Sequence, residues 1–193
     1  DIPKEKYFNN QYSRAQQIFY YLKNNITFQR KYEELLVLEV GCGAGGILQY
    51  FKEKGFKVKG MDLDEAYLKY GKETYGLDLA FGTLLDIKLD KKPDIIIYCQ
   101  VLEHILELNK ELKKIKKCLS EKGLLYIELP GIKNIHNIYK MDLLLYLQNA
   151  HTYHFTRTSL INLLSQNGFN IQSSNEVVRC IATTQKNNTK SHK

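Results

Sequence analysis

The chain has 193 residues, of which 44% are hydrophobic and 25% are charged. This length and composition are typical of one soluble globular domain and exclude wholesale disorder, a collagen-like repeat and a coiled coil. Lys and Arg outnumber Asp and Glu by 28 to 21, a net charge of +7. The lysines lie in scattered pairs, however, which indicates a solvated surface more than a polyanion-binding face.

Two features bear on where the chain works. No apolar run approaches the roughly 20 residues of a membrane helix, and the first residues lack the apolar core of a signal sequence. The four cysteines, which form no C-x-x-C pair and no zinc-site spacing, are Cys42, Cys99, Cys118 and Cys180. We therefore expect a reduced, cytoplasmic chain with no membrane insertion.

The first 130 residues alternate short apolar runs with amphipathic segments. A polar lead-in precedes a helix whose apolar face holds Ala15, Ile18, Phe19 and Leu22. Apolar runs then predict buried strands at 35–40, 57–62, 79–81, 94–99 and 124–129. Helices are predicted at 44–54, at 64–75 with Asp64 as N-cap, and at 102–119. This alternation predicts an α/β fold with a doubly wound, mostly parallel sheet and helices on both faces.

The C-terminal third is less regular. An apolar, helical segment is predicted at 134–150, a helix at 158–166 and two closing strands within 169–184. Residues 185–193 are polar and predict a loose tail. We find no linker or repeat and expect one domain over 1–193. Its parts are the lead-in 1–30, a core 31–130, an insertion 131–155 and the C-terminal helix and strands 156–184.

A glycine loop carries the first functional signal. Gly41-Cys42-Gly43-Ala44-Gly45-Gly46 follows a strand and opens a helix, the place where an α/β sheet binds a nucleotide-like ligand. Asp62 ends the second strand, and a carboxylate there can accept both hydrogen bonds from an adenosine ribose diol.

Two ligands compete for this loop. Gly41, Gly43 and Gly46 also fit the G-x-G-x-x-G pattern of dinucleotide enzymes. Glu39, just ahead of the loop, would repel a pyrophosphate but attract the amino and sulfonium groups of S-adenosylmethionine. We therefore favour S-adenosylmethionine, with S-adenosylhomocysteine as the product.

Several motifs in order resemble one family. Residues 38–45 (LEVGCGAG) resemble motif I of the class I S-adenosylmethionine-dependent methyltransferases, and 58–63 resemble their second strand. Residues 101–105 (VLEHI), 151–156 (HTYHFT) and 160–169 resemble the subgroup that includes ubiquinone-biosynthesis-type methyltransferases. The resemblance extends from about residue 7 to about 184 and implies a Rossmann-like, seven-stranded sheet whose last strand is antiparallel.

The resemblance also implies a set of cofactor-binding residues. They are Tyr12, Glu39, Gly41, Cys42, Gly43, Asp62, Leu63, Thr83, Leu84 and Gln100. Among these, Asp62 would hold the ribose and Leu63 would pack against adenine. Thr83 stands where many relatives carry an acid, so the adenine amine would meet Asp86 or a backbone group near Leu84. From the lead-in, Tyr7, Tyr12 and Arg14 would close over the cofactor carboxylate.

The acceptor side is less defined. Methyl transfer to oxygen needs an aligned nucleophile and a base, most often His. His151 and His154 precede a helix in a loop over the strand ends, and we weigh a role as base or acceptor contact against simple loop anchoring. For His104 we favour a structural role in orienting a turn. No third ligand has convincing spacing, so no metal is expected.

These observations lead to one expected function and two rivals. Cys99 lacks the preceding Pro of the cytosine-C5 methyltransferases, and the chain has no Asp/Asn-Pro-Pro-aromatic turn, so nucleic-acid bases are not expected as acceptors. We expect a small-molecule O-methyltransferase, monomeric or homodimeric. Its acceptor would be a sugar, a glycan precursor or a quinone-like metabolite, with a lean toward carbohydrate modification. The alternatives are an RNA or protein methyltransferase and a non-catalytic S-adenosylmethionine-binding protein.

Overall fold

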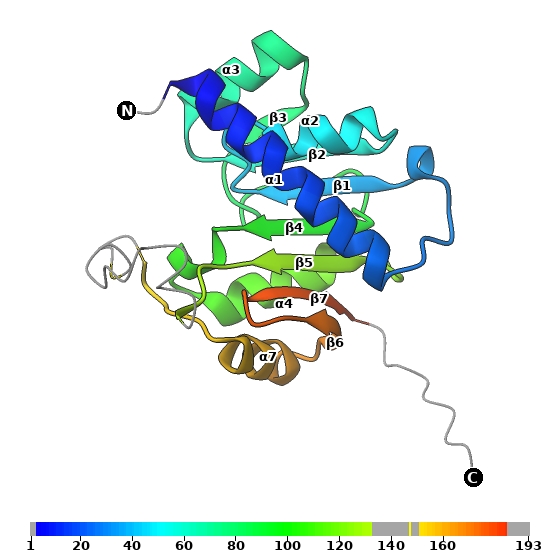
Figure 1. Cartoon of the computed structure of the whole chain (residues 1–193), viewed down its shortest axis with the longest axis vertical. Coiled ribbons are helices and arrows are strands. Elements are labelled where there is room, and N and C mark those ends of the chain that lie inside the picture. The colour runs from blue at the N-terminus through cyan, green and yellow to red at the C-terminus, as the bar shows by residue number, and fades with distance from the viewer. Residues whose placement is uncertain (1–2, 133–146, 148–150, 185–193) are drawn as a thin grey trace.

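A seven-stranded sheet forms the centre of the molecule, in the order β3-β2-β1-β4-β5-β7-β6 (Figure 1). This computed structural model describes residues 3–132, 147 and 151–184. The strands are β1 (Leu36–Val40), β2 (Lys57–Asp62), β3 (Leu79–Phe81), β4 (Ile95–Cys99), β5 (Leu124–Glu128), β6 (Asn170–Ser174) and β7 (Arg179–Thr183). The first five are parallel, whereas β7 runs antiparallel to β5. The predicted doubly wound sheet with an antiparallel last strand is therefore confirmed.

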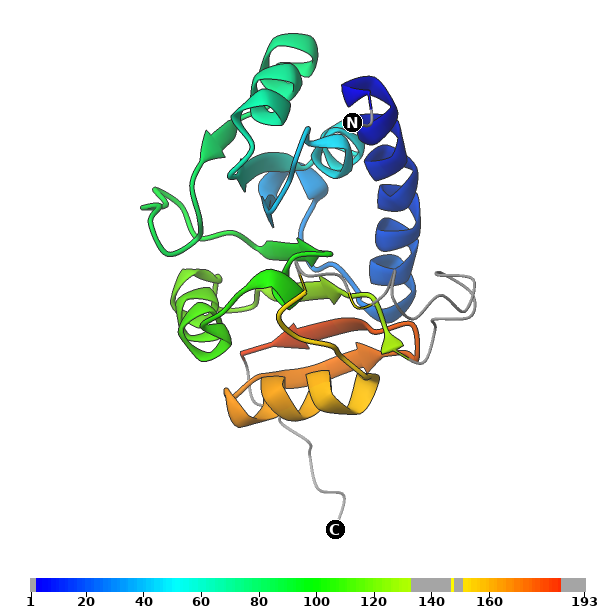
Figure 2. The ribbon, with the colours of Figure 1, turned by 90° about the vertical axis from the view of Figure 1, so that its left-hand side faces the viewer.

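Helices cover both faces of the sheet, as Figure 2 shows nearly edge-on. They are α1 (Lys4–Asn25), α2 (Gly46–Glu53), α3 (Glu65–Tyr75), α4 (Leu108–Cys118) and α7 (Arg157–Gln166), with the 3-10 turns η1 (Tyr32–Glu34) and η2 (Leu102–His104). Helices α1, α2 and α3 pack into one hydrophobic cluster, and α4 and α7 into the other. Of the described residues, no helix combines the length and the apolar character that crossing a bilayer requires.

The central strands supply both clusters because their side chains alternate between faces. In β1, Val37 faces α1 and α2 whereas Leu38 and Val40 face α4. The same alternation directs Glu39 toward the α1 face of the sheet. By this rule, Cys99 of β4, which packs in the α1 cluster, also points to that face. The carboxylate of Glu39 therefore lies on the face of the sheet that helix α1 covers.

Two predicted helices differ from the structure. Helix α1 begins at Lys4, so most of the lead-in is helical and not a separate polar segment. The single helix predicted over 102–119 is interrupted: η2 ends at His104 and α4 begins only at Leu108. The carbonyl of Glu103, which a continuous helix would use internally, accepts hydrogen bonds from the backbone amides of Thr152 and Tyr153 instead. The helix predicted at 134–150 lies outside the described residues, except for Leu147.

Candidate functional site

The glycine loop makes a tight turn between β1 and α2. Gly41, Gly43 and Gly45 all have positive φ angles, of 71°, 51° and 81°, which glycine adopts without steric cost. The amides of Gly41 and Cys42 donate to the carbonyl of Met61 at 2.8 and 3.0 Å, and this fixes the turn to β2. A Cβ atom on Gly41 would lie 2.3 Å from Cγ2 of Val101, so the space beside the loop is already filled on that side.

Asp62 joins this loop to the end of β2. Its Oδ2 accepts a hydrogen bond from the amide of Gly43 at 2.7 Å, and its Oδ1 accepts one from the amide of Asp64 at 2.9 Å. Asp64 in turn caps α3 by accepting from the amides of Ala66 and Tyr67, as predicted. Each carboxylate oxygen of Asp62 retains a second lone pair for a ligand hydroxyl.

A cavity of about 640 Å³ opens beside this loop. Its lining comes from the ends of β1, β2, β3 and β4, from the segment between β4 and α4, and from the first turn of α4. The lining residues are Val40, Gly41, Asp62, Leu63, Gly82, Thr83, Leu85, Val101, His104, Ile105, Leu106, Glu107 and Glu111. Leu63 is 62% exposed, so an apolar side chain is held open at the rim. A flat aromatic ring packed there would remove it from water, which is favourable. The predicted residues Gly41, Asp62, Leu63 and Thr83 thus meet in one cavity.

Glu39 is the unusual charge of the site. It is only 1% exposed, and its Oε2 has no hydrogen-bond partner among the described residues. Burial, with a smaller contribution from the negative charge of Asp62, raises the pKa of Glu39 well above its ordinary value. Burying a carboxylate oxygen without a hydrogen-bond partner is costly. A ligand cation placed next to it would remove that cost.

Helix α1 closes over the loop through two side chains. Tyr7 stacks on Tyr67 with ring centroids 4.5 Å apart, and its ring lies so close to Gly43 that a Cβ there would be 2.6 Å away. Burial and the nearby acids raise the pKa of Tyr7 to about 12, so its phenol stays protonated. Gln11 donates to the carbonyl of Cys42 and accepts from the amide of Gly46. Sequence reasoning missed Gln11, because nothing in its surroundings marks it among the polar residues of α1.

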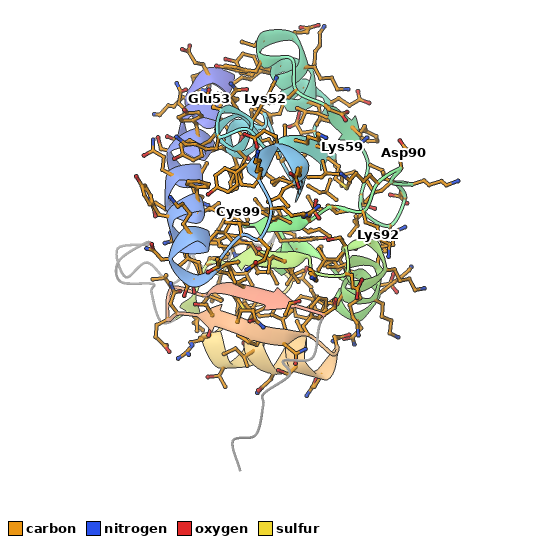
Figure 3. All side chains as sticks on the ribbon, turned by 90° about the vertical axis from the view of Figure 1, so that its right-hand side faces the viewer. Lys52, Glu53, Lys59, Asp90, Lys92 and Cys99 are labelled. Carbon is orange, nitrogen blue, oxygen red and sulfur yellow. The ribbon has the colours of Figure 1, made fainter. Side chains whose placement is uncertain are left out.

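Other predicted cofactor residues do not bring their side chains to the cavity. Tyr12 lies where α1 meets α2, and its hydroxyl donates to Glu53, which is labelled in Figure 3, at 2.5 Å. The side chains of Cys42 and Leu84 are fully buried in the two hydrophobic clusters, so only their backbone could meet a ligand. The prediction for the side chain of Tyr12 is therefore not supported. Packing requirements explain the positions of Cys42 and Leu84.

Gln100 directly follows β4 and has a strained backbone conformation. Its φ of 58° is uncommon for a residue with a side chain, and its amide donates to the carbonyl of Glu128 at 2.8 Å. Strain of this kind concentrates at functional sites. The conformation directs the chain from β4 into Val101, which packs on Gly41. The structure thus places Gln100 next to the glycine loop, although it does not line the cavity.

Arg14 reaches the ends of β4 and β5 beneath α1. Its Nη1 lies 3.7 Å from the sulfur of Cys99, labelled in Figure 3, and its Nε lies 4.0 Å from Oε1 of Glu128. Arg179 also donates to Glu128, at 2.9 Å. Burial raises the pKa of Cys99 to about 12, which opposes a thiolate. The structure therefore agrees with the interpretation of Cys99 as a buried strand cysteine.

The histidines gather beyond β4. The ring centroids of His104 and His151 are 5.0 Å apart, and those of His151 and His154 are 6.0 Å apart. Glu103 lies beneath them at 1% exposure, and burial raises its pKa to about 7. His104 is among the residues that line the cavity, whereas the predicted residues His151 and His154 are not. The proximity of His104 to His151 exists only in the folded chain, so the sequence alone could not indicate it.

Comparisons with known proteins agree with this geometry. A family model described as a methyltransferase domain matches residues 14–174. An uncharacterized methyltransferase of Staphylococcus carnosus is 30% identical over 122 residues, which cover 62% of this chain and 58% of that protein. A ubiquinone biosynthesis O-methyltransferase of Bradyrhizobium diazoefficiens is 29% identical over 98 residues, covering 48% of this chain and 39% of that one. The chain spans about half the length of the curated relatives it matches.

Among solved structures, the plantazolicin methyltransferase in complex with SAH superposes with a TM-score of 0.70 at 15% identity. The match covers 91% of this chain and 74% of that one. At this identity, the likeness concerns the fold.

Proposed function

Since this chain belongs to the S-adenosylmethionine-dependent methyltransferases, we propose that it methylates an oxygen atom of a small molecule. The observation that carries the proposal is the position of His104 in the lining of the cavity that the glycine loop and Asp62 share, with the ring of His151 5.0 Å from it. An oxygen acceptor must lose a proton as it attacks, and imidazoles are the usual groups that receive one.

The residues present fit the cofactor. The buried Glu39 carboxylate suits its amino group, Asp62 suits the ribose hydroxyls, and Leu63 suits the adenine ring. When bound, S-adenosylmethionine supplies an activated methyl group on a sulfonium sulfur, which is already a good leaving group. The chain therefore has to align the acceptor with that methyl group, exclude water and remove a proton.

We assign proton removal to the loop that carries His151 and His154. The amides of Thr152 and Tyr153 donate to the carbonyl of Glu103 at 2.9 and 3.1 Å, and these bonds hold the loop beside η2. A base on an anchored loop keeps its position during turnover, which general-base catalysis requires. Activity measurements on His151→Ala and His154→Ala distinguish a role as base from simple anchoring of the loop.

The cavity wall favours an acceptor with an apolar body. Leu85, Val101, Ile105 and Leu106 contribute to its lining. Apart from Asp62, which is proposed to hold the ribose, the lining side chains that can bond hydroxyls are those of Thr83, His104, Glu107 and Glu111. A quinone-like ring suits such a wall better than a free sugar, which needs many hydrogen-bond partners. The name of the Bradyrhizobium relative points to the same acceptor class. A carbohydrate acceptor is the second candidate within this proposal.

The test is a methylation screen with the purified chain and S-adenosylmethionine. Catechols and quinols, monosaccharides, peptides and a short RNA serve as acceptors, and mass spectrometry records the gain of one methyl group in place of a hydrogen. We expect O-methylation of a phenolic ring. Methylation of the RNA or the peptide, with none of the small hydroxyl compounds modified, would contradict the proposal.

A further inference from the structure

We propose that Glu103, His104 and His151 hold a divalent transition-metal cation at the edge of the cavity. One ligand atom from each residue lies within 4.8 Å of the other two. Metal–ligand bonds of about 2.0–2.2 Å would bring such atoms to roughly 3–3.5 Å from one another. Ligand atoms near the 4.8 Å limit would therefore have to move closer together for the cluster to close around an ion.

The burial of Glu103 is the first argument for a cation. Its side chain is 1% exposed, and neither carboxylate oxygen has a hydrogen-bond partner in the part of the chain that the structure describes. Buried charges in proteins are paired or coordinate metals. Two positive groups act on this carboxylate: His104 when it is protonated, with Nε2 at 3.9 Å from Oε1, and Arg14 from α1. Neither donates a hydrogen bond to it in the structure.

The scaffold holds the three ligands together. Glu103 and His104 are adjacent in η2, directly after β4, and the amides of Thr152 and Tyr153 bind the carbonyl of Glu103. These bonds bring His151 to the cluster from 47 positions further along the chain (151 − 104). The spacing of the histidines in the sequence could not indicate this site, because His151 reaches it only when its loop packs beside η2.

The donor set selects the class of cation. Two imidazole nitrogens and one carboxylate oxygen suit Zn²⁺, Fe²⁺, Co²⁺ or Ni²⁺, whereas Mg²⁺ and Ca²⁺ prefer oxygen ligands alone. Three protein ligands also leave coordination positions for a small molecule. Because His104 lines the cavity, the open side of the cluster lies toward the place where an acceptor would enter.

The role of the ion follows from this position and rests on the proposed function. A cation that contacts the acceptor hydroxyl would lower the pKa of that hydroxyl and orient its oxygen. His151 would then be a ligand and could not receive the proton. The task of base would pass to His154, which lies in the same loop but outside the cluster.

A cobalt titration tests the proposal without any acceptor. The chelator-treated chain is titrated with Co²⁺ and followed by visible absorption, and Zn²⁺ is then added as a competitor. We expect one Co²⁺ per chain and its displacement by Zn²⁺. Glu103→Gln and His151→Ala should each weaken binding more than about 100-fold, beyond the usual effect of losing a residue behind the ligands. His154→Ala, the matched control, should bind cobalt as the unmodified chain does.

Two results would overturn the metal site. One is a folded chain that binds S-adenosylhomocysteine but takes up no stoichiometric cobalt. The other is unchanged cobalt affinity in His151→Ala. If Glu103→Gln does not fold, His104→Ala takes its place in the titration, because His104 is the more exposed of the two ligands. If the chain binds cobalt but methylates no oxygen acceptor, the metal-site proposal stands and the proposed function is wrong. The two failures are therefore distinguishable.

Discussion

The backbone amide of Gly43 donates a 2.7 Å hydrogen bond to Oδ2 of Asp62. This bond ties the turn after β1 to the end of β2, so the residue that suits the ribose also shapes the glycine loop. If Asp62 holds the ribose as proposed, its loss removes a ligand contact together with this loop anchor.

Asp62→Ala should therefore weaken the binding of S-adenosylhomocysteine. A charge-assisted hydrogen bond contributes about 1.5–3 kcal/mol, which corresponds to a loss of about 10- to 150-fold in affinity. Isothermal titration calorimetry measures the effect. The control is Asp64→Ala, which removes the N-cap of α3 and should lower the free energy of unfolding by about 1 kcal/mol with little change in affinity. Unaltered binding by Asp62→Ala would remove the ribose assignment.

Comparing Gly41→Ala with Gly76→Ala distinguishes the stability lost through steric crowding from the stability lost through backbone strain. Both have positive φ, but a Cβ on Gly41 would meet Val101 at 2.3 Å, whereas nothing lies within 4 Å of one on Gly76. Gly76→Ala should cost about 1–2 kcal/mol of stability through φ alone. Gly41→Ala should cost a further 1–3 kcal/mol, roughly, because of the overlap. Urea unfolding measures both losses.

Val101→Ala tests whether contact with Val101 causes the extra loss of stability in Gly41→Ala. Introduced into Gly41→Ala, it should recover part of the lost stability, because it removes the atoms that the new methyl group would meet. Introduced alone, it should destabilise the chain by leaving a gap. Equal losses in the two glycine variants, or no recovery in the double variant, would show that the loop relaxes around the added methyl group.

Glu39→Gln should stabilise the chain and impair its binding. The pKa of Glu39 is raised in the folded state, so the folded chain holds this proton more tightly than the unfolded chain does. The stability from the protonated group is fully present below the ordinary value of 4.5 and is lost as pH rises through the folded-state pKa. At pH 8 we expect Glu39→Gln to be more stable by about 1–3 kcal/mol, and the advantage to shrink toward pH 5.

Urea unfolding at these two pH values checks the sign of the Glu39 effect. The same variant should bind S-adenosylhomocysteine more weakly, because the carboxylate that suits the amino group is gone. Glu65→Gln, on an exposed position of α3, is the matched control and should change neither quantity. A less stable Glu39→Gln at pH 8, or one with undiminished affinity, would contradict the role given to this carboxylate.

His154→Ala tests whether His154 is the base that removes the proton of the acceptor hydroxyl. With an acceptor from the screen in hand, this variant should slow turnover by about 10²–10⁴-fold if His154 is the base. Its affinity for S-adenosylhomocysteine should not change, because His154 does not line the cavity. A lowered rate that recovers at higher pH, where hydroxide replaces the base, would support proton removal. Full activity would leave His154 as a loop residue.

The strand and loop motifs were readable from the sequence because their physical causes are local. A short run rich in β-branched residues such as 95–99 favours a buried strand, and the glycines at 41, 43 and 45 adopt angles that other residues avoid. The side chain of Asp64 caps α3 within three residues of itself. Short-range preferences of this kind predicted the order of the elements, and with it the edge of the sheet where a ligand binds.

The interruption at 105–107 was not readable, because periodicity favours a continuous helix and the competing partners of Glu103 lie nearly fifty residues away. By contrast, the amino-acid order did indicate that Gly41, directly after β1, and Asp62, at the end of the neighbouring parallel strand β2, would lie together at one cavity. Only the tertiary structure decided that Tyr12 turns toward Glu53, that Gln11 bonds the loop, and that His151 joins Glu103 and His104. Such contacts depend on how separate elements pack, and no local pattern records them.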